Sequence, residues 1–323
     1  MPTPAPEPPA DPPADPPAEP AVQVDGLRKT YGAKVAVDGV GFTVARGEVF
    51  GILGPNGAGK TTTVEAVAGL RVGDAGRVRV LGIDPWTERE ALTRVLSIQL
   101  QESRLQAKIT VQEALELWSA LYDDPVPWRQ VAGRLGLGEH LRRRFGDLSG
   151  GQQQRLSIAL ALVARPQVVI LDELSTGLDP RARRDVWQVV RDLRDSGVTV
   201  LLVTHSMEEA QALCDRVAII DGGRIRALDT PAGLIRTAGE ATTMTFVPSA
   251  PVDLAALRSL PGVRAAYAEA GAVVVTGDEE VAVTVVTTLV AQGVVPRQLD
   301  VTSGSLDTAY LDLTATDRAE EPA

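Results

Sequence analysis

Short apolar runs alternate with amphipathic segments along most of this chain. The alternation extends from Ala21 to about Gly239 and predicts a sheet that is covered by helices. Runs rich in β-branched residues predict strands at residues 48–53, 167–171, 198–203 and 216–220. We therefore expect an α/β domain over residues 21–240.

Strand signals mostly disappear between about residues 87 and 147, where helical patterns dominate. Thr110 and Glu113 have the spacing of a capping box, in which two side chains satisfy the first N–H groups of a helix. The apolar positions of "TVQEALELWSALY" continue that helix. This stretch is predicted to be a helical subdomain inserted into the α/β domain.

A second pattern covers residues 241–323. Its order is strand, helix, two strands, helix, strand, at residues 243–247, 254–260, 263–268, 272–276, 280–292 and 295–301. That order fits a small ferredoxin-like α+β domain. The segment contains no cluster of nucleophile and base and no metal-ligand spacing, so we expect a regulatory or assembly role.

Composition excludes several classes of protein. Residues 1–20 repeat a Pro-Pro-Ala-acid unit, which predicts a disordered segment. A net charge of −10 and the lack of a long basic run disfavour nucleic acid as the main partner. The apolar runs fall short of the ~18–20 residues that a membrane-spanning helix needs, and the N-terminus lacks a signal-peptide pattern. A single cysteine, Cys214, cannot form an internal disulfide, which suits a reducing compartment. From the lack of a signal-peptide pattern we expect a cytoplasmic chain.

The segment "GPNGAGKT" matches G-x-x-x-x-G-K-[ST], the phosphate-binding loop between a strand and a helix. A predicted strand precedes it, and the helical pattern of "KTTTVEAVAGL" follows. Backbone N–H groups of such a loop surround phosphates, Lys60 neutralises their outer oxygens, and Thr61 offers its hydroxyl to Mg²⁺. The expected nucleotide ligands are Gly54, Pro55, Asn56, Gly57, Ala58, Gly59, Lys60, Thr61 and Thr62. The alternative is a glycine-rich turn that holds no ligand.

Two carboxylates, Asp172 and Glu173, end the apolar run "QVVIL". Carboxylates at the end of a buried strand are costly unless a cation or a proton uses them. In an enzyme with a phosphate-binding loop, Asp172 would hold the Mg²⁺ shell and Glu173 would polarise the attacking water. The alternative is an exposed pair of carboxylates without a catalytic role.

His205 is one of only two histidines and ends the predicted strand "VTVLLVTH". This places it at the carboxyl edge of the sheet, where open α/β folds bind their ligands. We therefore expect a contact between His205 and the γ-phosphate rather than a purely structural role. Ser206 and Glu209 have capping-box spacing at the start of the next helix.

A second segment suited to an anion is "DLSGGQQQR". Ser149 and Gln152 fit a capping box, but capping does not require the two glycines between them, Gly150 and Gly151. Glycines allow a phosphate to approach the N–H groups of a helix N-terminus closely. Further along, Asp179 before Pro180 has the pattern of an ordinary helix cap.

These motifs together resemble the ATP-binding subunits of ABC transporters, over residues 22 to about 236. The matching segments are the phosphate loop at 54–61, "LSGGQQQR" at 148–155, "VVILDE" at 168–173, "GLDP" at 177–180 and His205, in the family's order. The resemblance implies an ABC ATPase domain of the P-loop NTPase fold, with ATP and Mg²⁺ as cofactors. One departure is Leu174, where the family commonly has proline. A proline there would fix φ and remove a hydrogen-bond donor, and neither property is part of the chemistry.

The same resemblance implies further site residues. Tyr31 would stack on adenine, although it could be a turn aromatic. Gln101 would sit in the loop that senses Mg²⁺ and the membrane partner, with Gln99 as the competing candidate. The family works as a head-to-tail pair, so Ser149–Gln152 and Asp179 would contact the ATP held by the phosphate loop of the opposite subunit.

The resemblance also implies a function. The segment after residue 240, which ends "GSLDTAYLDLT", is similar to the C-terminal extension of daunorubicin-resistance ABC ATPases. We expect an ATPase, peripheral on the inner face of the cell membrane, that powers export of an amphipathic drug or natural product through a separate permease. The paired ATPase would be a second copy or a related subunit. The alternatives are a soluble ABC ATPase acting on ribosomes or DNA, and a nucleotide-binding regulatory module without turnover.

Overall fold

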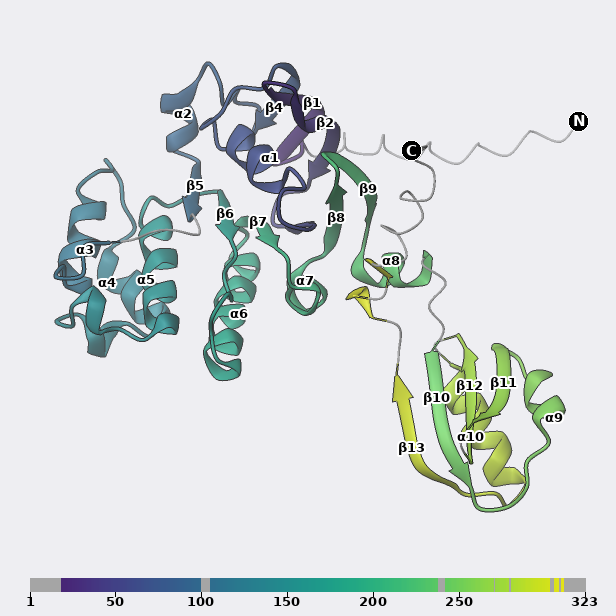
Figure 1. The fold of residues 1–323 in the computed structure, drawn as a ribbon. Coiled ribbons are helices and arrows are strands. Elements are labelled where there is room, and N and C mark those ends of the chain that lie inside the picture. The colour runs from purple at the N-terminus through teal and green to yellow at the C-terminus, as the bar shows by residue number, and fades with distance from the viewer. Residues whose placement is uncertain are drawn as a thin grey trace, which may run out of the picture.

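A computed structural model describes residues 19–99, 105–237, 242–269, 271–278, 280–302, 305–307 and 309–310. Its central sheet has the strand order β5-β6-β7-β3-β8-β9, parallel except for the antiparallel β9 (Figure 1). These strands are β3 (Val49–Leu53), β5 (Leu96–Gln99), β6 (Val168–Asp172), β7 (Thr199–Thr204), β8 (Arg216–Asp221) and β9 (Arg224–Asp229). The four strands predicted from the apolar runs are all present. Every residue of β3, β6 and β7 is buried, as expected for a sheet covered on both faces.

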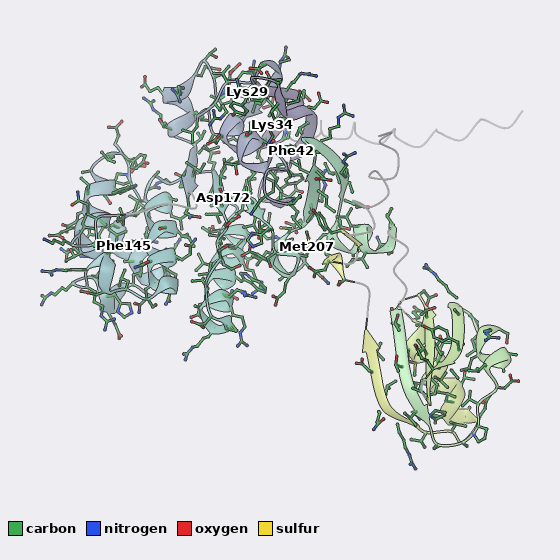
Figure 2. All side chains as sticks on the ribbon, viewed as in Figure 1. Lys29, Lys34, Phe42, Phe145, Asp172 and Met207 are labelled. Carbon is green, nitrogen blue, oxygen red and sulfur yellow. The ribbon has the colours of Figure 1, made fainter. Side chains whose placement is uncertain are left out.

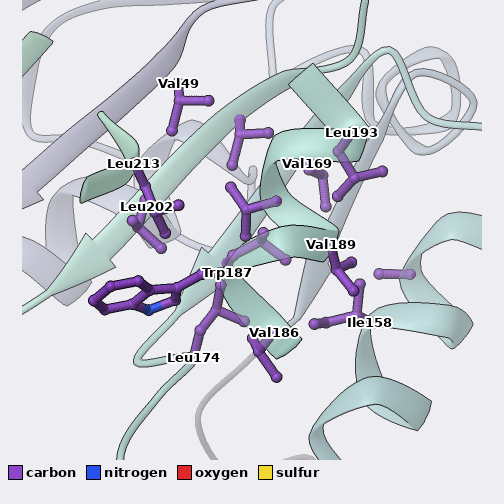
Figure 3. Close-up of a cluster of buried hydrophobic side chains, with 14 of the residues drawn as sticks. Val49, Ile158, Val169, Leu174, Val186, Trp187, Val189, Leu193, Leu202 and Leu213 are labelled. Carbon is purple, nitrogen blue, oxygen red and sulfur yellow. The ribbon is translucent and has the colours of Figure 1, made fainter. Parts of the chain in front are cut away.

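Opposite faces of the central sheet contribute to two different cores. Val49 and Leu53 of β3 point into the core shared with the helices, whereas Phe50 and Ile52 point into the second core. Figure 3 shows part of the first core, which includes Val186, Trp187 and Val189 from one helix. The covering helices are α1 (Lys60–Val67), α5 (Gly150–Val163), α6 (Pro180–Asp195), α7 (Met207–Leu213) and α8 (Pro231–Thr237).

The second core is closed by an antiparallel sheet with the strand order β2-β1-β4. Its strands are β1 (Val22–Tyr31), β2 (Lys34–Val44) and β4 (Ala75–Val80). Phe42 of β2 stacks on Phe50 of β3 with ring centroids 5.0 Å apart, which joins the two sheets. This antiparallel sheet places the β1–β2 hairpin next to the phosphate loop.

The helical stretch contains α2 (Arg89–Thr93), α3 (Val111–Ser119), α4 (Trp128–Arg134) and two short 3₁₀ turns at Gly138–His140 and Phe145–Asp147. The capping box of Thr110 and Glu113 at the start of α3 is confirmed. One strand, β5, lies inside the predicted range 87–147 and pairs with β6. A run of four residues, three of them buried, does not reveal by periodicity whether it forms a strand or a helical turn, which explains this difference.

The C-terminal unit has the predicted ferredoxin-like order of elements. They are β10 (Thr242–Pro248), α9 (Leu254–Arg258), β11 (Val263–Glu269), β12 (Ala272–Gly277), α10 (Val281–Ala291) and β13 (Pro296–Thr302). Its antiparallel sheet has the order β11-β12-β10-β13. Val285 and Leu289 of α10 pack on Met244 and Phe246 of β10, so this unit has its own core.

Among the described residues after β13, Leu306 and Tyr310 pack on the first unit. Leu306 is fully buried in the core that contains Met207 and Leu213 of α7 and Leu234 of α8, and Tyr310 packs against the same core. Figure 1 shows this yellow end of the chain beside α8. The boundary near residue 240 stays a prediction, and both ends of the C-terminal unit lead back to the first unit. No helix in the described part of the chain is long and apolar enough to span a bilayer.

Candidate nucleotide-binding site

The phosphate loop joins β3 to α1, and its glycines are required by its shape. Gly59 is the N-cap of α1 with φ 105°, and a side chain there would meet the carbonyl of Ala36 at 2.4 Å. Gly54 has φ 152°, and a Cβ atom would lie 2.1 Å from the carbonyl oxygen of Ile220. Backbone in this region strains any other residue, so glycine is needed at both positions. The loop is thereby pressed against its neighbours and the N-terminus of α1 is presented to a ligand.

Lys60, the first residue of α1, is buried beneath the loop and is only 6% exposed. Its Nζ donates hydrogen bonds to the carbonyl oxygens of Gly54 at 2.6 Å and Pro55 at 2.9 Å. Burial lowers the pKa of Lys60, and the nearby Glu173 and Asp172 oppose that shift. The ammonium is therefore held inside the curve of the loop, where phosphate oxygens would be its natural partners.

Asp172 ends β6 and is 7% exposed (Figure 2). Burial and, after it, the negative charge of Glu173 raise the pKa of Asp172 to about 6, against the opposing effect of the positive charge of Lys60. A cation bound nearby would stabilise the charged form of such a buried carboxylate. The hydroxyl of Thr61 lines the same pocket, and hard oxygen donors of these two kinds suit Mg²⁺.

Glu173 follows in a left-handed backbone conformation with φ 51°. Its N–H donates to the carbonyl oxygen of Val203 at 2.9 Å, which ties the strained residue to the neighbouring strand β7. Oε1 of Glu173 lies 3.3 Å from Nδ1 of His205, and Oε2 accepts from the hydroxyl of Thr176 at 3.4 Å. Backbone strain that is held by its surroundings is common at catalytic sites.

These groups meet in one pocket of about 640 Å³. The lining residues are Tyr31, Lys34, Ala36, Asn56, Gly57, Gly59, Lys60, Thr61, Thr62, Asp172, Glu173, Thr176 and His205. Lys34 and Thr176 were not singled out from the sequence. The sequence points to them only by position, since Lys34 follows Tyr31 by three residues and Thr176 follows Glu173 by three.

The capping box predicted for Ser149 and Gln152 is confirmed. The N–H of Ser149 donates to Oε1 of Gln152 at 3.0 Å, and the N–H of Gln152 donates to Oγ of Ser149 at 3.3 Å. Nε2 of Gln152 also lies 3.0 Å from Nε2 of His140. Because the Gln152 amide nitrogen is a donor, His140 accepts there and helps to hold the Gln152 side chain.

The two glycines of this turn differ in their surroundings. Gly150 is exposed, and an added Cβ would make only ordinary contact, 3.5 Å from Leu178. Gly151 is buried, and an added Cβ would lie 2.8 Å from Cβ of Ala182 on α6. Close packing of α5 against α6 is therefore a second reason for glycine at position 151. Phosphate access at Gly150 and Gly151 stays a prediction.

Asp179 caps α6, accepting from the N–H groups of Arg181 at 2.9 Å and Ala182 at 3.0 Å, with Pro180 at the first helical position. A Cβ atom added at Gly150 or Gly151 would reach Leu178 or Ala182, so this cap lies beside the Ser149 turn. Among the described residues, neither the turn nor Asp179 lines the pocket of the phosphate loop. The two segments predicted to bind phosphate thus lie apart on one chain.

Two further predictions have other outcomes. Gln101 lies outside the described residues, whereas its competitor Gln99 is buried in β5. The box predicted for Ser206 and Glu209 is half formed. Oγ of Ser206 accepts from the N–H of Glu209 at 3.2 Å, but the Glu209 carboxylate is buried and accepts from Nε1 of Trp187 at 3.1 Å instead.

Comparisons with known proteins agree with this geometry. Residues 37–176 match the family model for ABC transporters. The Nod factor export ATP-binding protein I of Rhizobium sp. (strain N33) is 40% identical over 67% of this chain and 72% of its own length. The daunorubicin/doxorubicin resistance ATP-binding protein DrrA of Streptomyces peucetius is 40% identical over 68% of each chain.

A solved structure is similar as well. It is the dimeric post-hydrolysis state of the ATP-binding cassette MJ0796 bound to ADP and Pi, at 26% identity, with a TM-score of 0.58 over 65% of this chain and 98% of that chain. The agreement covers the unit that holds the phosphate loop, the two carboxylates and His205. The chain therefore belongs to the ATP-binding subunits of ABC transporters, a family of ATPases that bind ATP and dimerise.

Proposed function

We propose that this chain hydrolyses ATP at sites shared between two ATPase subunits and thereby powers export through a separate membrane permease. The observation that carries the proposal is the separation of the two half-sites on one chain. The phosphate loop and Glu173 line one pocket, whereas the Ser149 turn and Asp179 lie together elsewhere. A head-to-tail pair of subunits would bring each turn to the nucleotide of the other.

Within such a site the residues have distinct roles. Lys60 binds the outer phosphate oxygens, and Tyr31 supports the base. Glu173 is the general base that orients and deprotonates the attacking water, while His205 contacts the γ-phosphate and fixes the Glu173 carboxylate across 3.3 Å. Thr61 and Asp172 would hold Mg²⁺, which supplies neutralisation of phosphate charge when bound. Gln101 is proposed to join that site.

The transport role rests on the relatives. Those named above export Nod factor or confer resistance to daunorubicin and doxorubicin. We infer an amphipathic drug or natural product as the cargo, and a location on the inner face of the cell membrane beside the permease. The C-terminal unit would serve regulation or assembly.

Two measurements test the proposal. The purified chain should hydrolyse ATP, with a rate that rises more than linearly with protein concentration if two subunits share each site. The tagged chain, isolated gently from native membranes, should carry with it a polytopic membrane protein. Recovery of ribosomes or DNA in place of a membrane protein would favour the soluble non-transport class of ABC ATPases and overturn the transport role.

A further inference from the structure

Tyr31 lies at an exposed hairpin end, where the strand itself does little to restrain the side chain. It is the last residue of β1, is 41% exposed, and is followed by the turn at Gly32 with φ 58°. A side chain at a hairpin end samples several rotamers unless its neighbours restrain it. Ordering such a side chain during binding lowers affinity, so a base-stacking ring gains from restraint before the ligand arrives.

The backbone before Tyr31 is held by one carboxylate. Asp74, in the loop before β4, accepts hydrogen bonds from the N–H of Thr30 at 2.7 Å and from the Thr30 hydroxyl at 2.6 Å. It also pairs with Nζ of Lys29 at 2.7 Å (Lys29 is labelled in Figure 2). The N–H of Asp74 itself donates to the carbonyl oxygen of Arg28 at 2.8 Å.

This arrangement differs from an ordinary surface ion pair, which contributes little to stability. Asp74 bonds a backbone N–H group, and its contacts include each of the three residues before Tyr31. These hydrogen bonds, from Lys29 first and then from Thr30, hold the pKa of Asp74 well below its usual range. The carboxylate therefore remains charged throughout the physiological pH range.

The ring of Tyr31 is held by a second residue. Cζ of Arg71 lies 5.2 Å from the ring centroid, within the range of a cation–π contact. Nε of Arg71 donates to Oε2 of Glu65 at 2.6 Å, and the N–H of Arg71 donates to the carbonyl oxygen of Glu65 at 3.1 Å. Glu65 belongs to α1, the helix that begins at Lys60 of the phosphate loop. A chain of contacts thus connects the phosphate-binding helix to the ring.

We infer that Asp74 and Arg71 are positioning residues that hold Tyr31 ready to receive the base of the nucleotide. Asp74 fixes the backbone that leads to the ring, and Arg71 fixes the ring relative to α1. Neither residue lines the pocket of the phosphate loop, whereas Tyr31 does. The inference rests on the proposed role of Tyr31 at the base.

A double-mutant cycle tests this coupling, with binding of MgATP and of the base-free magnesium tripolyphosphate measured by displacement of a fluorescent nucleotide. Tyr31→Ala should weaken MgATP about 5- to 150-fold, the contribution of stacking a base on an aromatic ring. Asp74→Ala should weaken MgATP about 2- to 12-fold, the range expected when one side chain must be ordered on binding. Neither substitution should change the affinity for magnesium tripolyphosphate.

In the Tyr31→Ala background, Asp74→Ala and Arg71→Ala should have no further effect on MgATP. Asp74→Asn keeps an acceptor for Thr30 and should recover part of the loss. A matched control is Asp84→Ala, because Asp84 also binds an arginine and a backbone N–H, that of Trp86 at 3.0 Å, outside the pocket. This control should leave MgATP affinity unchanged.

Two results would overturn the inference. Additive losses in the Tyr31→Ala background, or an equal loss of tripolyphosphate, would show that Asp74 only supports the fold. Normal MgATP binding by Tyr31→Ala would show that Tyr31 does not contact the base, and the inference would then be wrong. Failure of the unchanged chain to bind MgATP would instead contradict the proposed function.

Discussion

Nδ1 of His205 lies 3.3 Å from Oε1 of Glu173, although the two residues are 32 positions apart in sequence. They follow β7 and β6, neighbouring parallel strands whose carboxyl ends meet at one edge of the sheet. The pairing places a histidine beside the proposed base and beside a pocket that also contains Lys60 and Asp172.

Replacement of Glu173 by glutamine should remove hydrolysis but not nucleotide binding. The amide keeps the size of the side chain but cannot take a proton from water, so the rate should fall by a factor of about 10² to 10⁴. Since ATP then joins two subunits and is not hydrolysed, light scattering should show a dimer with ATP and a monomer without it.

Lys60→Ala provides the control for this experiment, because its own phosphate loop is weakened and it should remain monomeric with or without ATP. Hydrolysis at the unchanged rate by Glu173→Gln would remove Glu173 from the role of base. Loss of ATP binding would show that this carboxylate is structural.

Introduction of a negative charge at Gly150 should block the shared site. Gly150 is exposed, and its surroundings accept a side chain, so Gly150→Asp should fold and bind ATP through its own phosphate loop. Hydrolysis should fall at least about tenfold, because like charges brought together at an interface cost several kcal/mol. The aspartate would face the partner's γ-phosphate.

Gly133→Asp on α4 is the matched control, since nothing lies within 4 Å of a Cβ atom there, and its hydrolysis should be unchanged. Gly151→Ala should instead reduce the free energy of unfolding by about 1–3 kcal/mol, because the new methyl group overpacks against Ala182. Normal turnover by Gly150→Asp would reject the shared-site geometry.

The Asp172 carboxylate should make the nucleotide-free protein less stable as the pH rises. Its folded pKa of about 6 exceeds the value of 3.8 expected when unfolded, so the folded state binds more protons between these values. Below about pH 4, protonated Asp172 contributes up to about 3 kcal/mol to the free energy of unfolding. This contribution is lost as the pH rises through the folded pKa of about 6.

Denaturant titrations of the chain and of Asp172→Asn from pH 4 to pH 7, without Mg²⁺, measure this effect as a difference between the two proteins. The gap between their unfolding free energies should widen in favour of Asp172→Asn as the pH rises. A gap independent of pH would show that Asp172 titrates at its ordinary value in the folded state.

Removal of the C-terminal unit should preserve ATP binding but reduce stability. The phosphate loop lies wholly in the first unit, so a chain ending at Thr237 should still bind ATP. Such a chain also loses Leu306, which is fully buried in the first core. Leu306→Ala in the full chain should itself lower the free energy of unfolding by about 2–5 kcal/mol, as measured by denaturation.

Leu299→Ala is the comparison for that variant, since Leu299 is 44% exposed in the C-terminal unit and should cost much less. If Leu306→Ala were as stable as the unchanged chain, its packing would be unimportant. If the truncated but folded chain failed to bind ATP, the expected boundary near residue 240 or the regulatory role would be wrong.

Local residue patterns were enough to predict many of the elements and much of the candidate chemistry. The glycine spacing of residues 54–61, the caps at Ser149 and Asp179 and the alternation in the C-terminal unit depend on residues within a few positions of one another. The ferredoxin-like order and the capping boxes of Thr110 and Ser149 were therefore predicted correctly. Short-range hydrogen bonds and strict backbone requirements leave a readable pattern.

Contacts between distant segments were decided only by the tertiary structure. Packing of α5 on α6 gave a second reason for Gly151, and burial turned Glu209 from its expected cap toward Trp187. Leu306 joined the first core, although its sequence position suggested the second unit. In each case the free energy depends on which surfaces meet after folding, and close packing between distant segments leaves no periodic signal in the chain.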